Sequence, residues 1–360
     1  MTKLVIAGAG KIGAMIAQML LDTGDYAVTI ADRDEAALKL IGLPDITCKV
    51  ADMGNEDDLR ALLSGQDVVI SACPYFLNTG IARMARDCGV HYFDLTEDVE
   101  TTRAIRALAE DADTAFMPQC GLAPGFIGIA AYSLAQSFED LDSVAMRVGA
   151  LPKFPTNRLK YNLTWSTDGL INEYCNPCEA IYEGRKREVL PLEGYEMFSL
   201  DGVNYEAFNT SGGLGTLCET LEGKLNFLDY KTVRYQGHCE AMKLLLNELR
   251  LNERRDLLKD ILETSVPMTL QDVVLIFATV TGTKNGRFTQ ESMARKIYGR
   301  RIGGREWSAI QVTTAAGICA CVDLHRQGLL PGRGFLRQED VRLDDFLANR
   351  IGRYYEETTE

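Results

Sequence analysis

The sequence has 360 residues, of which 46% are hydrophobic and 25% charged, a composition typical of folded globular proteins. A chain of this length is expected to form two domains. Its formal net charge of −13 argues against nucleic acid as a partner, because an acidic surface repels phosphates. We expect a cytoplasmic location, since ten cysteines suit a reducing compartment and a strand follows Met1 without room for a signal peptide. No apolar run is long enough to predict a membrane span.

The cysteines predict no metal site. Cys175 and Cys178 have a spacing found in zinc sites, but no second pair or nearby histidine completes a ligand set. Cys319 and Cys321 stand in a run of small apolar residues and are expected to be buried thiols.

The first 120 residues alternate between strand and helix patterns. Continuous apolar runs, typical of buried parallel strands, are separated by segments with helical periodicity. Asn55 is expected to cap one of these helices, and Asp98 another. The expected strands are 4–7, 27–31, 46–50, 68–72, 91–95 and 115–119, and the expected helices are 12–20, 34–41, 56–63, 81–88 and 99–112. This order predicts a doubly wound parallel sheet.

The pattern changes after residues 121–125. A helix over 126–138 is followed by alternating strands, a hairpin that turns at 183–186, and a strand over 272–283 that ends in the turn residues 284–286. A long helix of small residues is predicted over 308–327 and a final amphipathic helix over 340–355. The middle of the chain therefore reads as a mixed, largely antiparallel sheet with a few helices.

A glycine-rich loop joins the first strand to the first helix. Gly8 permits the tight turn, Gly10 lets the backbone approach a pyrophosphate, and Gly13 lets the helix pack closely on the sheet. The helix N-terminus offers free N–H groups to phosphates. Asp32 lies 19 residues beyond Gly13, where a carboxylate would bind the ribose hydroxyls. Its charge favours NAD over NADP, although Arg33 could accept a 2′-phosphate and leaves NADP open.

Further cofactor contacts are expected where later strands end. Asp52 and Met53 could flank the adenine, although an ordinary turn before a helix explains them nearly as well. The expected cofactor contacts are Gly8, Gly10, Lys11, Ile12, Gly13, Asp32, Arg33, Asp52, Met53, Ala72, Cys73, Pro74, Tyr75, Gly121, Leu122 and Pro124. The loop of residues 121–125 is expected to face the nicotinamide as a shaped backbone surface.

The chain resembles the saccharopine dehydrogenase/reductase family, and within it the lysine 6-dehydrogenase-like branch. The resemblance covers most of the chain and rests on the Gly8–Gly13 fingerprint and on the segments 71–74, 92–97, 121–125, 210–214 and 234–238. It implies an NAD(P)-dependent oxidoreductase that acts on an amine or imine carbon of an amino acid. Ala123 stands where saccharopine and carboxyspermidine reductases often carry an aspartate, which favours the lysine 6-dehydrogenase branch.

The family resemblance also implies the domain plan. A Rossmann domain of residues 1–125 and about 305–360 would bind the dinucleotide, and residues 126–304 would form an α+β domain for substrate binding and dimer contacts. The long helix over 308–327 suits the C-terminal helix that returns to the Rossmann domain. A homodimer is expected.

Oxidising an amine requires loss of a proton from nitrogen before the hydride leaves the neighbouring carbon. Because a lysine amine has a pKa of about 10.4, the site needs a base or must favour the neutral amine. His238 and Glu97 are the candidate catalytic groups, and Arg234 is the candidate clamp for a substrate carboxylate, with a surface salt bridge as its alternative. Other candidates for substrate contact are Thr96, Trp165, Thr210 and Ser211; His91 and His325 are expected to be structural.

The leading hypothesis is a dehydrogenase that moves hydride from the ε-carbon of lysine to NAD. A second is a saccharopine- or carboxyspermidine-type reductase that joins an amine to an aldehyde. A third, from another class, is a non-catalytic protein that senses NAD.

Overall fold

The structure is a computed structural model that describes residues 1–356. The chain forms two compact units. The largest continuous part of the first is Met1–Phe126, and that of the second is Ile127–Arg300. The first unit consists of Met1–Phe126, Arg301–Arg305 and Gln311–Tyr355, and the second contains Ile127–Arg300 and Glu306–Ile310. The first unit is therefore discontinuous, since its part Gln311–Tyr355 follows Ile127–Arg300 and Glu306–Ile310 of the second along the chain.

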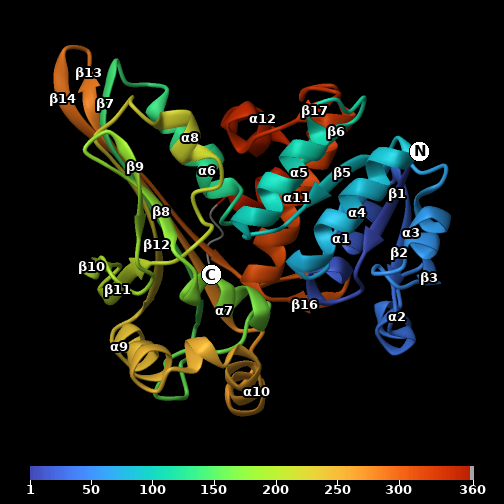
Figure 1. Ribbon diagram of the computed structural model, residues 1–360, viewed down its shortest axis with the longest axis horizontal. Coiled ribbons are helices and arrows are strands. Elements are labelled where there is room, and N and C mark those ends of the chain that lie inside the picture. Colours follow the sequence, from blue (N-terminus) through green and yellow to red (C-terminus); the bar gives the residue numbers. More distant parts are fainter. Residues whose placement is uncertain (357–360) are drawn as a thin grey trace. The chain divides into compact units, whose positions relative to one another are not determined.

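A seven-stranded parallel sheet forms the centre of the first unit (Figure 1), in the order β17-β6-β5-β4-β1-β2-β3. The strands are β1 (Thr2–Ala7), β2 (Tyr26–Asp32), β3 (Thr47–Val50), β4 (Val68–Ser71), β5 (His91–Asp94), β6 (Ala115–Met117) and β17 (Gly334–Phe335). The helices are α1 (Lys11–Leu21), α2 (Glu35–Ile41), α3 (Glu56–Leu63), α4 (Tyr75–Cys88), α5 (Val99–Ala109), α11 (Ala309–Arg326) and α12 (Leu343–Ala348). The strand order 3-2-1-4-5-6 is that of a dinucleotide-binding Rossmann fold, so the predicted doubly wound sheet is confirmed.

Helices cover both faces of this sheet. On one face, α3, α4 and α5 pack on Val5, Val69 and Tyr92, which belong to one buried apolar cluster. On the other face, α1 approaches Ile6, and α11 brings His325 against Phe93. Both faces are buried, which explains why the strands read as continuous apolar runs.

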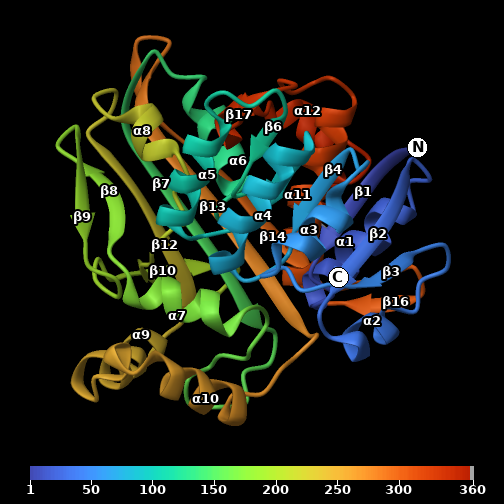
Figure 2. The same ribbon diagram turned by 45° about the vertical axis from the view of Figure 1, so that its right-hand side comes forward.

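The second unit is built on an eight-stranded mixed sheet (Figure 2), as predicted, with the main path β10-β11-β12-β7-β13-β14. Its strands are β7 (Asp140–Pro152), β8 (Cys178–Tyr182), β9 (Arg185–Val189), β10 (Glu196–Leu200), β11 (Val203–Asn209), β12 (Phe227–Tyr235), β13 (Asp272–Lys284) and β14 (Arg287–Tyr298). Its helices are α6 (Phe126–Ala135), α7 (Thr167–Cys175), α8 (Leu217–Leu221), α9 (His238–Lys243) and α10 (Arg255–Ser265), with a π-helical turn η1 (Leu244–Glu248) and a 3-10 turn η2 (Leu251–Glu253). A small hairpin of β15 (Arg300–Ile302) and β16 (Arg305–Trp307) precedes α11.

Most predicted elements agree with the structure, but two do not. The helix expected from residue 81 begins at Tyr75, because Pro74 occupies its N-cap position and fits the start of a helix. The single helix expected over 340–355 is wrong: the structure has the 3-10 turn η3 (Gln338–Asp340), α12, and the 3-10 turn η4 (Gly352–Tyr355). Asn349 breaks the helix with extended backbone, and its side-chain oxygen accepts from the N–H groups of Ile351 and Gly352.

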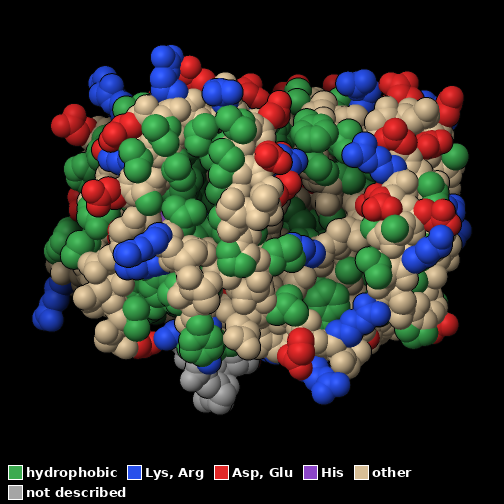
Figure 3. Space-filling view, turned by 90° about the horizontal axis from the view of Figure 1, so that it is seen from below, with side chains coloured by type: hydrophobic (Ala, Val, Ile, Leu, Met, Phe, Trp, Pro, Cys, Tyr) green, Lys and Arg blue, Asp and Glu red, His purple; other side chains and the backbone are tan. Residues whose placement is uncertain are grey.

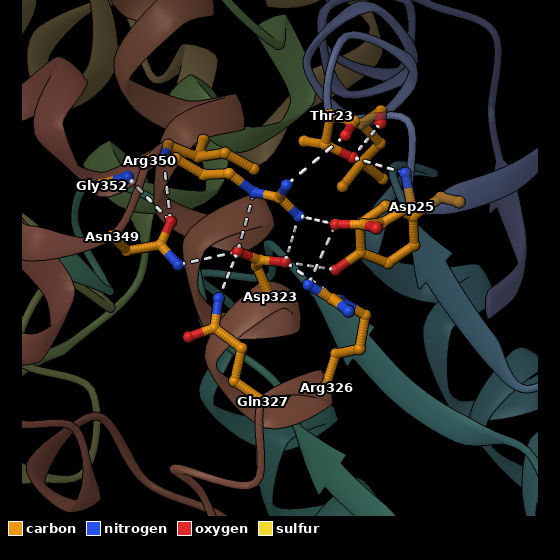
Figure 4. A network of polar contacts seen from close by, with 11 residues as sticks. Thr23, Asp25, Asp323, Arg326, Gln327, Asn349, Arg350 and Gly352 are labelled. Carbon is orange, nitrogen blue, oxygen red and sulfur yellow. Dashed lines mark hydrogen bonds and ion pairs between the residues drawn. The ribbon is translucent and has the colours of Figure 1, made fainter. Parts of the chain in front are cut away.

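The C-terminal segments are fastened to the first unit by a polar network around Asp323 of α11 (Figure 4). This carboxylate is fully buried and accepts hydrogen bonds from Tyr26 of β2 at 2.9 Å, Asn349 at 2.9 Å and Arg350 at 2.9 Å. Arg350 also pairs with Asp25 at 2.6 Å. The network therefore links the beginning of β2 to residues that lie 297 to 325 positions later.

Three further observations concern surface charge, membrane-crossing helices, and metal sites with the cysteines. On the face drawn in Figure 3, acidic and basic side chains are interspersed with hydrophobic and other side chains. Within residues 1–356, no helix combines the length and the hydropathy needed to cross a membrane. In the same range, no cluster of three or more His, Cys, Asp or Glu residues could hold a metal ion, and the ten cysteines are free thiols.

Candidate active site

The glycine-rich loop has the geometry that a dinucleotide requires. Gly8 has a φ of +106°, and a Cβ atom there would lie 2.8 Å from the carbonyl oxygen of Ala72. A Cβ atom on Gly13 would lie 2.0 Å from the carbonyl oxygen of Gly8, so α1 could not pack against the loop with any other residue. Gly10 caps α1 without a side-chain hydrogen bond and has open space where its Cβ would be. The loop thus fits a pyrophosphate at the N-terminus of α1.

Asp32 lies beside this loop at the end of β2. One carboxylate oxygen accepts from the N–H of Ala9 at 2.7 Å, and the other accepts from the N–H of Asp34 at 2.9 Å. These bonds fix the carboxylate and leave lone pairs on both oxygens for ribose hydroxyls. Arg33 follows it and is exposed.

Two pairs of predicted cofactor residues have evident structural roles. The side chain of Asp52 accepts from the N–H of Gly54 at 2.9 Å and shapes the turn before α3, while Met53 is buried in the apolar cluster beneath that helix. Cys73 is half-buried after β4, and burial, followed by the charge of Asp32, raises the pKa of its thiol to about 12. The Cys73 side chain is therefore a neutral thiol at physiological pH. Pro74 and Tyr75 begin α4.

The loop of residues 118–125 follows β6 at the carboxyl edge of the sheet. Phe126 N–H donates to Gly121 O at 3.0 Å, and a Cβ atom on Gly125 would lie 2.0 Å from that same oxygen. Gln338 donates from its side chain to the carbonyl oxygens of Pro118 and Gln119, at 2.8 and 2.9 Å. Contacts within the loop and the hydrogen bonds from Gln338 therefore fix its backbone conformation.

Asp94 connects this loop with the one after β5. It is fully buried, and one oxygen accepts from the N–H groups of Thr96 at 2.9 Å and Gln119 at 3.0 Å. Its other oxygen accepts from the Tyr92 hydroxyl at 2.7 Å and the Asn78 amide at 3.3 Å. Burial raises the pKa of Asp94 to about 6, although these hydrogen bonds oppose the shift. Asp94 was not among the predicted site residues, although it lies in the 92–97 segment that also contains Thr96 and half-buried Glu97.

In the second unit, Arg234 and His238 belong to one buried polar chain. Arg234, on β12, donates from Nε to the Tyr174 hydroxyl oxygen at 2.9 Å, and the guanidinium lies 5.1 Å from the centre of the Tyr161 ring. The Tyr174 hydroxyl is 3.2 Å from Nε2 of His238, whose Nδ1 is 2.7 Å from the carbonyl oxygen of Leu159. Because a carbonyl only accepts, Nδ1 carries the proton and the Tyr174 hydroxyl donates to Nε2.

Burial and the neighbouring cation keep this histidine neutral. Desolvation, and then the charge of Arg234, lower the pKa of His238 to about 3. Arg234 is only 3% exposed, and its hydrogen bonds run to a phenol and to the carbonyl oxygen of Val233. This burial excludes a surface salt bridge, the alternative role considered for Arg234.

The segment after β7 and the end of β11 place further polar groups in the second unit. Among the described residues, buried side-chain oxygens without a hydrogen-bond partner include those of Tyr161, Asn162, Thr164 and Thr210. Buried polar groups normally have partners, so such oxygens mark places where a ligand or water would bind. Ser211 is buried and donates to Pro177 O at 3.0 Å, and Trp165 packs partly buried against the adjacent apolar cluster. Tyr161 and Tyr174 were not predicted, because only the fold brings them to Arg234.

Family models match almost the whole chain. Residues 4–117 match the saccharopine dehydrogenase NADP binding domain, and residues 121–352 match the saccharopine dehydrogenase C-terminal domain. This chain belongs to the saccharopine dehydrogenase family. The family resemblance predicted from the motifs is confirmed, and the first match identifies the N-terminal domain as one that binds NAD(P).

Individual relatives of this saccharopine dehydrogenase family member are distant. The mitochondrial alpha-aminoadipic semialdehyde synthase of Rattus norvegicus is 22% identical over 67% of this chain and 27% of its own length. The Bos taurus protein of the same name is 19% identical over 90% of this chain and 37% of its length. The chain thus spans well under half of these relatives. The apo saccharopine dehydrogenase (L-Glu forming) of Saccharomyces cerevisiae shares the fold, with a TM-score of 0.75, 17% identity and 96% coverage of both chains.

Proposed function

We propose that this chain is an NAD-dependent dehydrogenase that oxidises the ε-amine carbon of lysine, or of a similar amino acid, to an imine. The observation that carries the proposal is the buried guanidinium of Arg234, whose hydrogen-bond partners are uncharged and on which the buried carboxylate of Glu173 acts through its charge, without a hydrogen bond. A buried cation of this kind is stabilised by a carboxylate that arrives with the substrate. The unpaired oxygens of Tyr161 and Thr210 supply neutral groups for the rest of an amino acid.

In this proposal, carboxylate binding also changes the basicity of His238. The charge of Arg234 is one of the two causes that lower the His238 pKa, and a bound carboxylate would offset that charge. Binding the substrate would therefore raise the His238 pKa toward its ordinary range. Tyr174, which donates to Nε2, would give its hydroxyl proton to the imidazole and take up the proton that the substrate ammonium group loses, so that the phenol stays neutral.

In the first unit, Glu97 and Thr96 are the proposed groups for contact with the substrate amine. Both follow β5 at the carboxyl edge, where doubly wound sheets bind ligands. Glu97 would hold the substrate ammonium group or accept its proton. The bound nicotinamide would accept the hydride, which is the chemistry the cofactor supplies.

NAD is the proposed cofactor, because the fixed carboxylate of Asp32 would repel a 2′-phosphate. We expect NADH to bind at least about tenfold more tightly than NADPH, a difference of about 1.4 kcal/mol. Asp32→Ser removes the repulsion and leaves Arg33 in place, so it should narrow or reverse this preference. Equal affinities of the wild-type chain for the two cofactors, measured by fluorescence titration, would contradict the proposal.

A reductase that joins an amine to an aldehyde, of the saccharopine or carboxyspermidine type, is the second candidate. The yeast structure of that name favours it by fold alone, and the semialdehyde synthases by distant sequence similarity. Ala123 favours the dehydrogenase. A non-catalytic NAD sensor would bind the dinucleotide and turn over no amine.

The test follows the absorbance of reduced nicotinamide with L-lysine, ornithine, saccharopine and cadaverine, a diamine without a carboxylate. Arg234→Gln should raise KM for lysine at least about tenfold and leave the weaker use of cadaverine unchanged, because only lysine loses an ion pair. His238→Ala should lower kcat sharply and leave NAD affinity nearly unchanged. Turnover of no amine in either direction would overturn the enzymatic proposal, and wild-type turnover by the His238 variant would remove this residue from it.

We also propose that the second unit forms the contacts of a homodimer and that the protein acts in the cytoplasm. The family resemblance supports the dimer, and the ten free thiols support a reducing compartment. Light scattering of the purified chain tests the first part: a monomeric mass at micromolar concentration would refute it. Imaging of the tagged protein in cells of its source tests the second.

A further inference from the structure

We propose that Asp94 is a positioning residue for the nicotinamide end of the cofactor site, because one carboxylate fixes the backbone of two loops at the carboxyl edge of the sheet. The inference rests on the proposed function in placing the nicotinamide on the β4–β6 side. The glycine-rich loop and Asp32, which would hold the adenosine and pyrophosphate, lie on β1 and β2.

The side chain of Asp94 contacts both the loop after β5 and the loop after β6. Thr96 N–H and Gln119 N–H both donate to the same oxygen, Oδ1, so their separation is set by one atom. Cys120 N–H donates to the backbone oxygen of Asp94 at 2.9 Å, which adds a third bond from the same residue. These bonds hold the start of the loop after β5 and the 118–125 loop at a fixed separation.

The backbone of Gln119, which donates to Asp94, has a strained conformation. Gln119 has a φ of +65°, a left-handed conformation that is strained for a residue with a side chain. Its N–H is bound by Asp94 and its carbonyl oxygen by Gln338, so both sides of the strained residue are restrained. Backbone strain persists where surrounding contacts determine it, and it is concentrated at functional sites.

The second oxygen of Asp94 lies in a separate set of contacts. Oδ2 accepts from Tyr92 and Asn78, and the Asn78 amide oxygen in turn accepts from Ser71 at 2.7 Å. The titratable groups around the carboxylate are Tyr92 of β5 and Cys120 of the loop, with Cys73 beyond β4 and Cys321 of α11 behind them. Burial raises the pKa of Tyr92, Cys73 and Cys120 far above neutrality, so Asp94 is the member of this set that changes charge near pH 6.

The test compares Asp94→Asn with Tyr92→Phe in the full-length chain. Asn has the size of Asp but no charge and one acceptor oxygen, so the bonds to the two loop N–H groups lose their charge assistance or, with the amide turned the other way, are lost. Phe removes one hydrogen bond to the same carboxylate and leaves both loop bonds in place. NADH is the probe: its affinity reports the whole site, and the emission shift of its bound nicotinamide reports that end alone.

We expect Asp94→Asn to change NADH affinity less than about threefold, to lose at least about half of the nicotinamide emission shift, and to remove its pH dependence near pH 6. With an amine substrate, kcat should fall about 10- to 100-fold at an unchanged KM. Tyr92→Phe should stay within about threefold of wild type. A wild-type emission shift in Asp94→Asn, or an equal loss in Tyr92→Phe, would overturn the inference.

The emission measurement needs no amine, so it separates this inference from the proposed function. A chain that oxidises no amine, but loses the nicotinamide signal in Asp94→Asn, refutes the dehydrogenase and supports the positioning role. If Asp94→Asn fails to fold, Asp94→Glu is measured instead, because it keeps the charge and displaces the carboxylate oxygens from the two loop N–H groups: a reduced emission shift supports the role of Asp94, and a wild-type emission shift refutes it.

Discussion

Replacing Asp323 by alanine should destabilise the first unit, because the change removes the acceptor shared by five side chains. Tyr26 and Asn349, at 1% and 6% exposure, would keep buried donors without a partner. Each such donor costs about 1–3 kcal/mol. Arg326 and Arg350 are 31% and 36% exposed, so water compensates them in part. The free energy of unfolding should fall by about 4 kcal/mol, within the range known for broken buried ion pairs.

The measurement is a urea titration followed by circular dichroism, with a thermal melt in which this loss corresponds to a fall of about 10 °C. Asp323→Asn keeps the shape and should cost about half as much. Glu35→Ala is the matched control: its ion pair with Lys39 is 67–71% exposed and should contribute less than about 0.5 kcal/mol. A loss below about 1 kcal/mol in Asp323→Ala would refute the reasoning.

The pH dependence of this effect has a definite sign. Burial tends to raise the pKa of Asp323, but hydrogen bonds from Arg350, Asn349 and Tyr26 outweigh it and the pKa is lowered. The ionised form is thus the one that the fold favours. Its stabilisation is present above the ordinary carboxyl pKa and is lost as the pH falls below that value. The difference between wild type and Asp323→Asn should therefore shrink in acid.

Three further predictions concern single side chains. Burial, and then the charge of His91, lower the pKa of His325 to about 4. The fold therefore favours the neutral imidazole, and the free energy of unfolding should fall as the pH falls from 6.5 to 4. His325→Phe should remove this fall from an acid titration. Gly13→Ala should abolish NADH binding, whereas Gly80→Ala, which meets no atom within 4 Å, should bind normally and gain up to about 1 kcal/mol of stability. Asp272→Ala should cost about 2 kcal/mol in a urea titration, because its carboxylate accepts from the first N–H groups of α11; a cost below about 0.5 kcal/mol would refute that role.

Local signals in the sequence predicted the elements that short-range chemistry determines. Asn55 caps α3 as expected, and Asp98 caps α5. The turn at Glu183 and Gly184 joins β8 to β9. In each case the residue type and its immediate neighbours decide the backbone conformation, so one sequence suffices.

The sequence could not predict contacts between residues that are distant along the chain. Arg234 was identified from its motif, but Tyr174 lies 60 positions away and the Leu159 carbonyl 79 positions from His238. The break at Asn349 was missed because it depends on a side-chain contact. The Asn349 side chain replaces the helical hydrogen bonds at this point, but the apolar spacing of the sequence continues unchanged. Helix periodicity reports burial and carries no record of such local competition.

The order of segments has a consequence for synthesis. The seven-stranded sheet is complete only with β17, and Asp323, Asn349 and Arg350 reach Tyr26 and Asp25 near the other end. During synthesis, strands β1–β6 leave the ribosome before the strands of the second unit. Helix α11, which covers one face of their sheet, is synthesised only after those strands. The nucleotide-binding half would thus leave the ribosome incomplete, with the apolar face that α11 covers exposed to chaperones until α11 has been synthesised.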